Sequence, residues 1–178
     1  MARLSWPDHN QVKAAAALLA LVGGVIGYVA ARREFRVRES LGYIQRSREG
    51  AVGNASDVLV RFWQSELGRS LWDDVSESDF QARVAIAVEQ ASLVTHVREV
   101  HGFYDEVALC VQSRACDSRT TCRFFFREMM AFGNTYQNYL NDWSKDWGED
   151  VFRNVRHFLN EECRDQRAAY SDRQGRMR

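Results

Sequence analysis

An uninterrupted apolar segment near the N-terminus constrains this chain more than any other feature. Residues 14–31 are eighteen consecutive residues without a charged or strongly polar side chain. As a helix rising ~1.5 Å per residue, the segment is about 27 Å long, close to the ~30 Å hydrocarbon thickness of a bilayer. Its leucine, isoleucine and valine side chains each contribute roughly 0.3–0.6 kcal/mol toward insertion at central positions. The sequence therefore predicts one transmembrane helix over residues 14–31.

Two alternatives to a membrane anchor exist for this segment. A cleaved signal peptide has a shorter apolar region of ~7–15 residues and a cleavage site of small residues, which Val29, Ala30 and Ala31 imitate. A buried helix of a soluble protein is the other alternative. The apolar run is too long for a signal peptide and Arg32 and Arg33 follow it at once, so we favour the anchor.

The charges beside the segment predict its orientation and its lipid contacts. A dense basic stretch follows it, whereas only Arg3 and Lys13 are basic before it. The residues of this stretch, here called the arginine collar, are Arg32, Arg33, Arg36 and Arg38. Basic residues are retained in the cytoplasm, so we expect a single-pass protein of the inner (plasma) membrane with its N-terminus outside. Each collar arginine near anionic membrane lipid is worth about 1 kcal/mol.

Small residues within the segment predict helix association. Gly23, Gly27 and Ala31 recur every four residues and share one helix face. Small side chains at this spacing let two transmembrane helices approach closely and pack by dispersion. We expect self-association or docking to another span here, the alternative being that small residues are simply common in spans.

The charge distribution divides the remainder of the chain. The total is 24 basic against 24 acidic residues, which does not resemble a nucleic-acid-binding protein. Residues 32–48 carry a net charge of +4, residues 49–163 of −8 and residues 164–178 of +3. The expected domains are a short extracytoplasmic N-terminus (1–13), the span (14–31), a basic juxtamembrane helix (32–48), a helical cytoplasmic domain (54–170) and a basic tail (171–178).

Apolar periodicity predicts helices throughout the chain, and no alternating strand pattern competes. Glycines and capping residues set the expected boundaries. The expected helices run from the span to about residue 48, from 54 or 56 to 72, from a Ser76–Asp79 capping box onward with a bend or end at Gly102, from 117 or 118 to about 143, and from 151 to 163. The fold class is therefore all-α: an N-terminal transmembrane helix followed by a cytoplasmic helical bundle.

The stretch from His101 to Asp117, followed by a long aromatic helix to Trp143, resembles a known family. It is similar to a bacterial single-span membrane family catalogued as domain of unknown function 4760. The matching positions are Phe103, Tyr104, Glu106, Leu109, Val111, Asp117 and Trp143. Gly102 departs from the family pattern, which has a more polar residue there, often asparagine. The resemblance implies an N-terminal span and a helical cytoplasmic domain, and it implies no established activity.

The sequence contains no recognised catalytic or cofactor motif. It has no phosphate loop, no dinucleotide fingerprint and no Glu-x-x-His pair for a di-iron site, so we expect no cofactor and no metal. His101, Asp105 and Glu106 form the most polar helical cluster. His101 and Asp105, one turn apart, suit a hydrogen bond that raises the imidazole pKa, as in an acid–base pair. They equally suit a helix-surface ion pair, which we favour.

The four cysteines give no zinc-site spacing. Cys110, Cys116 and Cys122 are six residues apart and Cys163 is distant, whereas structural zinc sites favour Cys-x-x-Cys. A cytoplasmic domain keeps its thiols reduced, so we expect free thiols, with Cys122 and Cys163 as small core residues.

These observations lead to one functional prediction and two alternatives. We expect a non-enzymatic, membrane-anchored interaction or scaffold protein that binds a protein partner or forms a homo-oligomer at the cytoplasmic face. The alternatives are a membrane-tethered enzyme with a site near His101, Asp105 and Glu106, and a regulated effector that oligomerises to disturb the membrane.

Overall fold

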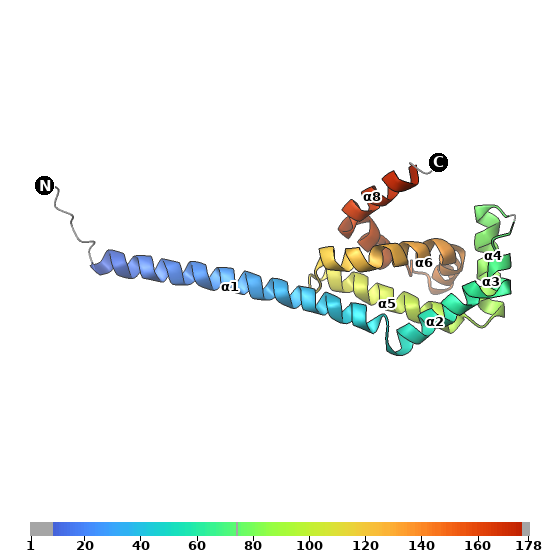
Figure 1. Ribbon diagram of the computed structural model, residues 1–178, viewed down its shortest axis with the longest axis horizontal. Helices are drawn as coiled ribbons and strands as arrows, with labels where there is room; N and C mark the ends of the chain where they lie inside the picture. Colours follow the sequence, from blue (N-terminus) through green and yellow to red (C-terminus); the bar gives the residue numbers. More distant parts are fainter. Residues whose placement is uncertain (1–8, 74, 176–178) are drawn as a thin grey trace.

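The computed structural model describes residues 9–73 and 75–175, and within these ranges the chain is helical without a β-strand (Figure 1). The all-α prediction is confirmed. The helices are α1 (His9–Arg46), α2 (Gly50–Gln64), α3 (Glu66–Ser70), α4 (Glu77–Gln90), α5 (Val94–Gln112), α6 (Ser118–Trp147), α7 (Arg153–His157), the π-helical turn η1 (Phe158–Glu162) and α8 (Arg164–Gly175). Parts of the predicted N-terminal segment and basic tail, residues 1–8 and 176–178, lie outside the described residues.

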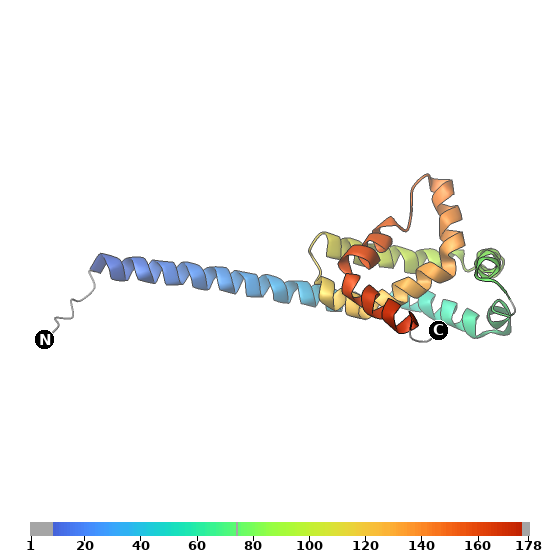
Figure 2. The same ribbon diagram turned by 90° about the horizontal axis from the view of Figure 1, so that it is seen from above.

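Helix α1 is one continuous rod whose N-terminal part projects away from the rest of the molecule (Figures 1 and 2). It is long and apolar enough to cross a membrane. None of the described residues in its most apolar stretch is buried in the protein. Leu21, for example, is 69% exposed. No interruption separates the apolar segment from the arginine collar, so the predicted span and juxtamembrane helix form a single element.

The remaining helices form a bundle around α5 and α6. Helix α2 packs against α5, and α4 packs against α6. Helix α7 packs against α5, and η1 contacts both α5 and α6. The largest fully buried side chains are Phe125, Met129 and Phe158. Fully burying a side chain of this size contributes roughly 1.5–3 kcal/mol, so this aromatic core holds the bundle together.

Helix α6 begins and ends at residues whose type predicts those boundaries. The Asp117 carboxylate accepts a hydrogen bond from the Thr120 amide at 2.8 Å, and Gly148 ends the helix in the left-handed conformation with φ 70°. Tyr136 departs from helical geometry inside α6, where its hydroxyl accepts a hydrogen bond from Trp63 Nε1 at 2.9 Å. The helix therefore bends around the core.

The helix expected from residue 54 or 56 to residue 72 is divided. Ser65 ends α2 and caps α3, since its hydroxyl accepts a hydrogen bond from the Gly68 amide at 3.1 Å. This break rotates the apolar stripe, so Leu59 and Leu71 are buried while Leu67 is 55% exposed. Gly68 is required here, because a Cβ would collide with the carbonyl oxygen of Phe62.

Three further boundaries differ from the sequence expectation. The second helix begins at Gly50 rather than at residue 54 or 56, so Gly50 and Gly53 belong to α2 and the break after the first helix falls at residues 47–49. Ser92, with φ 56°, separates α4 from α5, whereas the prediction of a bend or end at Gly102 is wrong. The last predicted helix is split by η1, and Phe158 and Leu159 of this π-helical turn are buried.

Replacing Gly102 by alanine is expected to raise the free energy of unfolding by about 0.5–1 kcal/mol, because Gly102 lies inside α5 and a Cβ there meets no atom within 4 Å. Gly148→Ala is the matched control, with an expected loss of about 1–2 kcal/mol because its φ of 70° is left-handed. Urea unfolding measures both. A destabilising Gly102→Ala would contradict an uninterrupted α5.

The prediction of free thiols is wrong. Cys110 is bonded to Cys116 across the α5–α6 turn, and Cys122 of α6 is bonded to Cys163, which follows η1. Together these two bonds involve every cysteine of the chain. Spacing alone did not show the pairing, because the second bond joins residues 41 apart that only the bundle brings together.

Candidate functional site at the anchor–domain junction

The residues predicted to mediate helix association lie on the free part of α1. Ala31 is exposed, and a Cβ built on Gly23 or Gly27 would meet nothing within 4 Å. Their face is therefore open to a second helix. Association itself stays a prediction.

His101 lies in the interior rather than on a helix surface. It is 5% exposed, and its Nε2 donates a hydrogen bond to the Val151 carbonyl oxygen at 2.9 Å. The rings of Trp143 and Phe152 flank the imidazole at centroid distances of 5.1 and 5.9 Å. Burial lowers the pKa of His101 and outweighs the raising effects of the Val151 bond and the Asp105 charge. The expectation of a raised pKa is therefore wrong.

The other two residues of the predicted polar cluster have separate partners. Asp105 Oδ2 accepts a hydrogen bond from Asn154 Nδ2 at 3.2 Å. Glu106 forms an exposed ion pair with Arg46 at 3.0 Å, which connects the end of α1 to α5. An exposed pair of this kind is worth about 0–1 kcal/mol. The cluster is thus a buried histidine, an internal hydrogen bond and a surface ion pair.

The lowered pKa of His101 predicts a pH-dependent stability. The folded-state pKa is below the unfolded-state value of about 6.5, so the unfolded chain binds the proton more readily. Stability is full above pH ~6.5 and falls as the pH drops through it, by at most about 1.4 kcal/mol per pH unit. Urea unfolding of His101→Gln between pH 5 and 7.5 should lack this component. The exposed His157, changed to glutamine, is the control, and a pH dependence retained by His101→Gln would contradict the assignment.

A buried polar contact joins α1 to the start of α6. The Ser40 side chain is 0% exposed, and its hydroxyl donates to the Arg36 carbonyl oxygen at 2.9 Å. The same hydroxyl accepts from the Asp117 amide at 2.9 Å and lies 3.1 Å from Thr121 Oγ1. The Asp117 amide also reaches the Arg36 carbonyl oxygen at 3.3 Å. These bonds fix the collar segment of α1 against the N-terminal end of α6.

A cavity of about 400 Å³ opens beside this contact, and we call it the junction hollow. Its lining residues are Tyr28, Val29, Arg32, Arg33, Arg36 and Asp117. Among the described residues, none of its three arginines forms an ion pair within 4 Å. Arg36 Nε is buried without a hydrogen-bond partner. The fourth collar residue, Arg38, is exposed and does not line the hollow.

Asp117, the carboxylate among the described residues that line the junction hollow, already accepts hydrogen bonds. Asp117 Oδ1 accepts hydrogen bonds from the amide and the hydroxyl of Thr120 at 2.8 and 2.7 Å. These hydrogen bonds, assisted by the charges of Arg33 and Arg119, lower the pKa of Asp117. Asp117 therefore remains ionised, and the junction hollow combines three guanidinium groups with one carboxylate.

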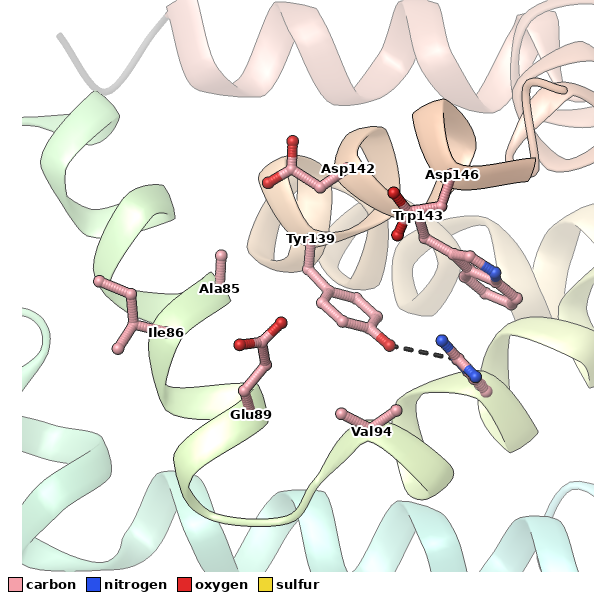
Figure 3. Close-up of a pocket in the computed structure, with 9 residues that line it drawn as sticks. Ala85, Ile86, Glu89, Val94, Tyr139, Asp142, Trp143 and Asp146 are labelled. Atoms are coloured by element: carbon pink, nitrogen blue, oxygen red, sulfur yellow. Dashed lines mark hydrogen bonds between the residues drawn. The ribbon is translucent and has the colours of Figure 1, made fainter. Parts of the chain in front are cut away.

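A second hollow, of about 250 Å³, lies between α4, α5 and α6 (Figure 3). Arg98 Nε donates to the Tyr139 hydroxyl at 3.3 Å, and the Arg98 guanidinium carbon lies 4.9 Å from the centre of the Trp143 ring. Glu89, Asp142 and Asp146 add carboxylates to the lining. A cation of the chain itself, Arg98, thus already contacts the aromatic wall of this hollow.

The collar arginines were predicted from the sequence, but the residues that form a cavity together with them were not. Tyr28 carried a weak signal, since aromatic residues gather at membrane interfaces. Ser40 carried none, and Asp117 was expected only as a helix start, because the contact between them joins residues 77 apart. In the described part of the chain, no group of three histidine, cysteine or acidic residues is placed to hold a metal.

No family model matches this chain, and neither the curated proteins nor the solved structures contain a match. The resemblance to domain of unknown function 4760 therefore stays a prediction.

Proposed function

We propose that this chain is a single-span membrane protein whose helical domain binds a protein partner or a second copy of itself. The observation that carries the proposal is α1, whose unburied apolar part continues without a linker into the helix that docks on α6. A rod of this kind would hold the bundle directly beside the bilayer, where its exposed surface could meet a partner in the same membrane.

Site-specific photo-crosslinking in native membranes tests the proposal. A photoactivatable residue at Ala30 lies near the Gly23 and Gly27 face, whereas the same residue at Val25 points to the opposite face, given 100° per residue. We expect a discrete dimer or a stoichiometric partner adduct from Ala30 and much less from Val25. Probes on the exposed domain residues Ile86 and Leu109 extend the search to the bundle. Only monomer from every position would contradict association.

For the orientation, we propose that the helical domain lies on the oxidising side of the membrane, opposite to the sequence expectation. The support is that all four cysteines are paired. Disulfides persist in the periplasm and other oxidising compartments and are rare in the cytosol, where thiols are kept reduced. Cys122 and Cys163 are also buried in the core, so their bond is part of the packing of α6.

The arginine collar favours the other orientation, and the two observations have different weight. Basic residues bias insertion by an energetic preference, and long domains translocate largely regardless of their charge. A disulfide depends directly on the redox state of its compartment. We therefore give the cysteine pairing precedence, and the collar requires another explanation.

A further inference from the structure

We propose that the junction hollow binds the phosphate headgroup of one anionic lipid. The inference rests on the proposed transmembrane placement of α1, and it explains a basic collar on an exported domain. In this proposal the arginines line a binding site and do not act only as a diffuse positive surface.

The position of the junction hollow suits a lipid headgroup. The apolar segment ends at Ala31, and Arg36 lies five residues further along the same helix, a rise of about 7.5 Å. Tyr28 and Val29 form an apolar wall one turn before the arginines. The cavity therefore spans the level at which acyl chains give way to phosphates, with an apolar and a basic end in the matching order.

The charge of the junction hollow suits a phosphate diester. Three guanidinium groups face one carboxylate that Thr120 already engages, so the described lining residues carry an excess of two positive charges. Arg36 Nε is a buried donor without an acceptor, and leaving such a donor unpaired is unfavourable. A phosphate accepts two parallel hydrogen bonds from one guanidinium, which lysine cannot provide.

The walls of the junction hollow are held in place by the fold. The Ser40 hydroxyl and the Asp117 amide both bond to the Arg36 carbonyl oxygen, at 2.9 and 3.3 Å. The helix that carries the arginines is thereby fixed against the residue that closes the cavity. Its volume of about 400 Å³ is within the usual 300–1,000 Å³ range for small-molecule sites.

Native mass spectrometry of the full chain, released from detergent micelles, tests the proposal. With phosphatidylglycerol added, we expect one retained lipid per chain, and little retention of phosphatidylcholine. Arg33→Gln removes an exposed arginine of the hollow, and Arg36→Lys keeps the charge but removes the guanidinium fork. Each should weaken retention at least about tenfold, as expected for losing a charge-assisted hydrogen bond.

Arg38→Gln is the matched control, because it removes an equal charge from the same helix at an exposed position two residues after Arg36 that does not line the hollow. It should leave retention unchanged. Equal loss in Arg38→Gln, or full retention in Arg33→Gln, would overturn the proposal in favour of diffuse attraction. Displacement of the lipid by millimolar inorganic phosphate would overturn the lipid as ligand. If Arg36→Lys fails to fold, Arg33→Gln still distinguishes a lipid site in the junction hollow from diffuse attraction.

Carbonate extraction of the same proteins from vesicles separates this proposal from the proposed anchor. A chain that stays in the bilayer but retains no lipid in the mass spectrum would refute the junction site alone. A chain that carbonate removes from the bilayer would refute the anchor on which the site rests.

Discussion

Replacing both Cys122 and Cys163 by alanine is expected to lower the free energy of unfolding by about 4 kcal/mol. The bond closes a loop of 41 residues, and the chain-entropy model gives about this value for such a loop. Urea unfolding of the full chain in detergent, followed by tryptophan fluorescence, measures the loss. The matched variant, Cys110→Ala with Cys116→Ala, opens a loop of only six residues and should lose roughly 2 kcal/mol.

A reductant provides the internal control for this experiment. Reduction should destabilise the wild-type chain to about the level of a variant lacking both disulfides, and it should leave that variant unchanged. Equal stability of oxidised and reduced wild-type protein would show that the bonds are absent or contribute nothing to the fold.

Replacing Leu21 and Val25 by arginine is expected to abolish membrane integration. Each arginine at the centre of a span costs roughly 2.5–3.5 kcal/mol, so the pair exceeds what the modest apolar content of this segment supplies. Both side chains are exposed in α1, so the change leaves the bundle untouched. Carbonate extraction should move the variant from the membrane pellet to the supernatant.

The control for this variant is the pair Leu21→Ile and Val25→Ile, which should remain in the pellet. The intact mass of the membrane-bound protein completes the test. A chain that retains residues 1–31 is anchored by them, whereas a chain that begins after Ala31 would identify the segment as a cleaved signal peptide.

Local signals allowed most helices of the fold to be predicted. Asp117 and Ser76 are capping residues that act on amides three positions away, and Gly148 ends α6 through its own backbone freedom. Errors arose where a tertiary contact decided the outcome. Ser65 divides a stretch of regular apolar spacing at a point where Gly68 packs against the preceding helix turn. The spacing of apolar residues does not indicate that contact.

The functional residues were harder to predict for the same physical reason. The arginine collar is visible in the sequence, but the difference between Arg36 and Arg38 depends on Asp117, which is distant along the chain. His101 has polar neighbours in sequence, yet Trp143 and Phe152 surround it in space, and burial reverses the expected shift of its pKa. Cysteine pairing likewise needs the bundle before it can be recognised.

The most direct test of a membrane-anchored domain on the oxidising side is the state of its cysteines in cells. Cells with a periplasm that express the full chain are acid-quenched, and denatured protein is treated with a maleimide of large mass before and after reduction. We predict no mass addition before reduction and four additions after it. Four additions without reduction would place the domain in the reducing compartment and contradict the account.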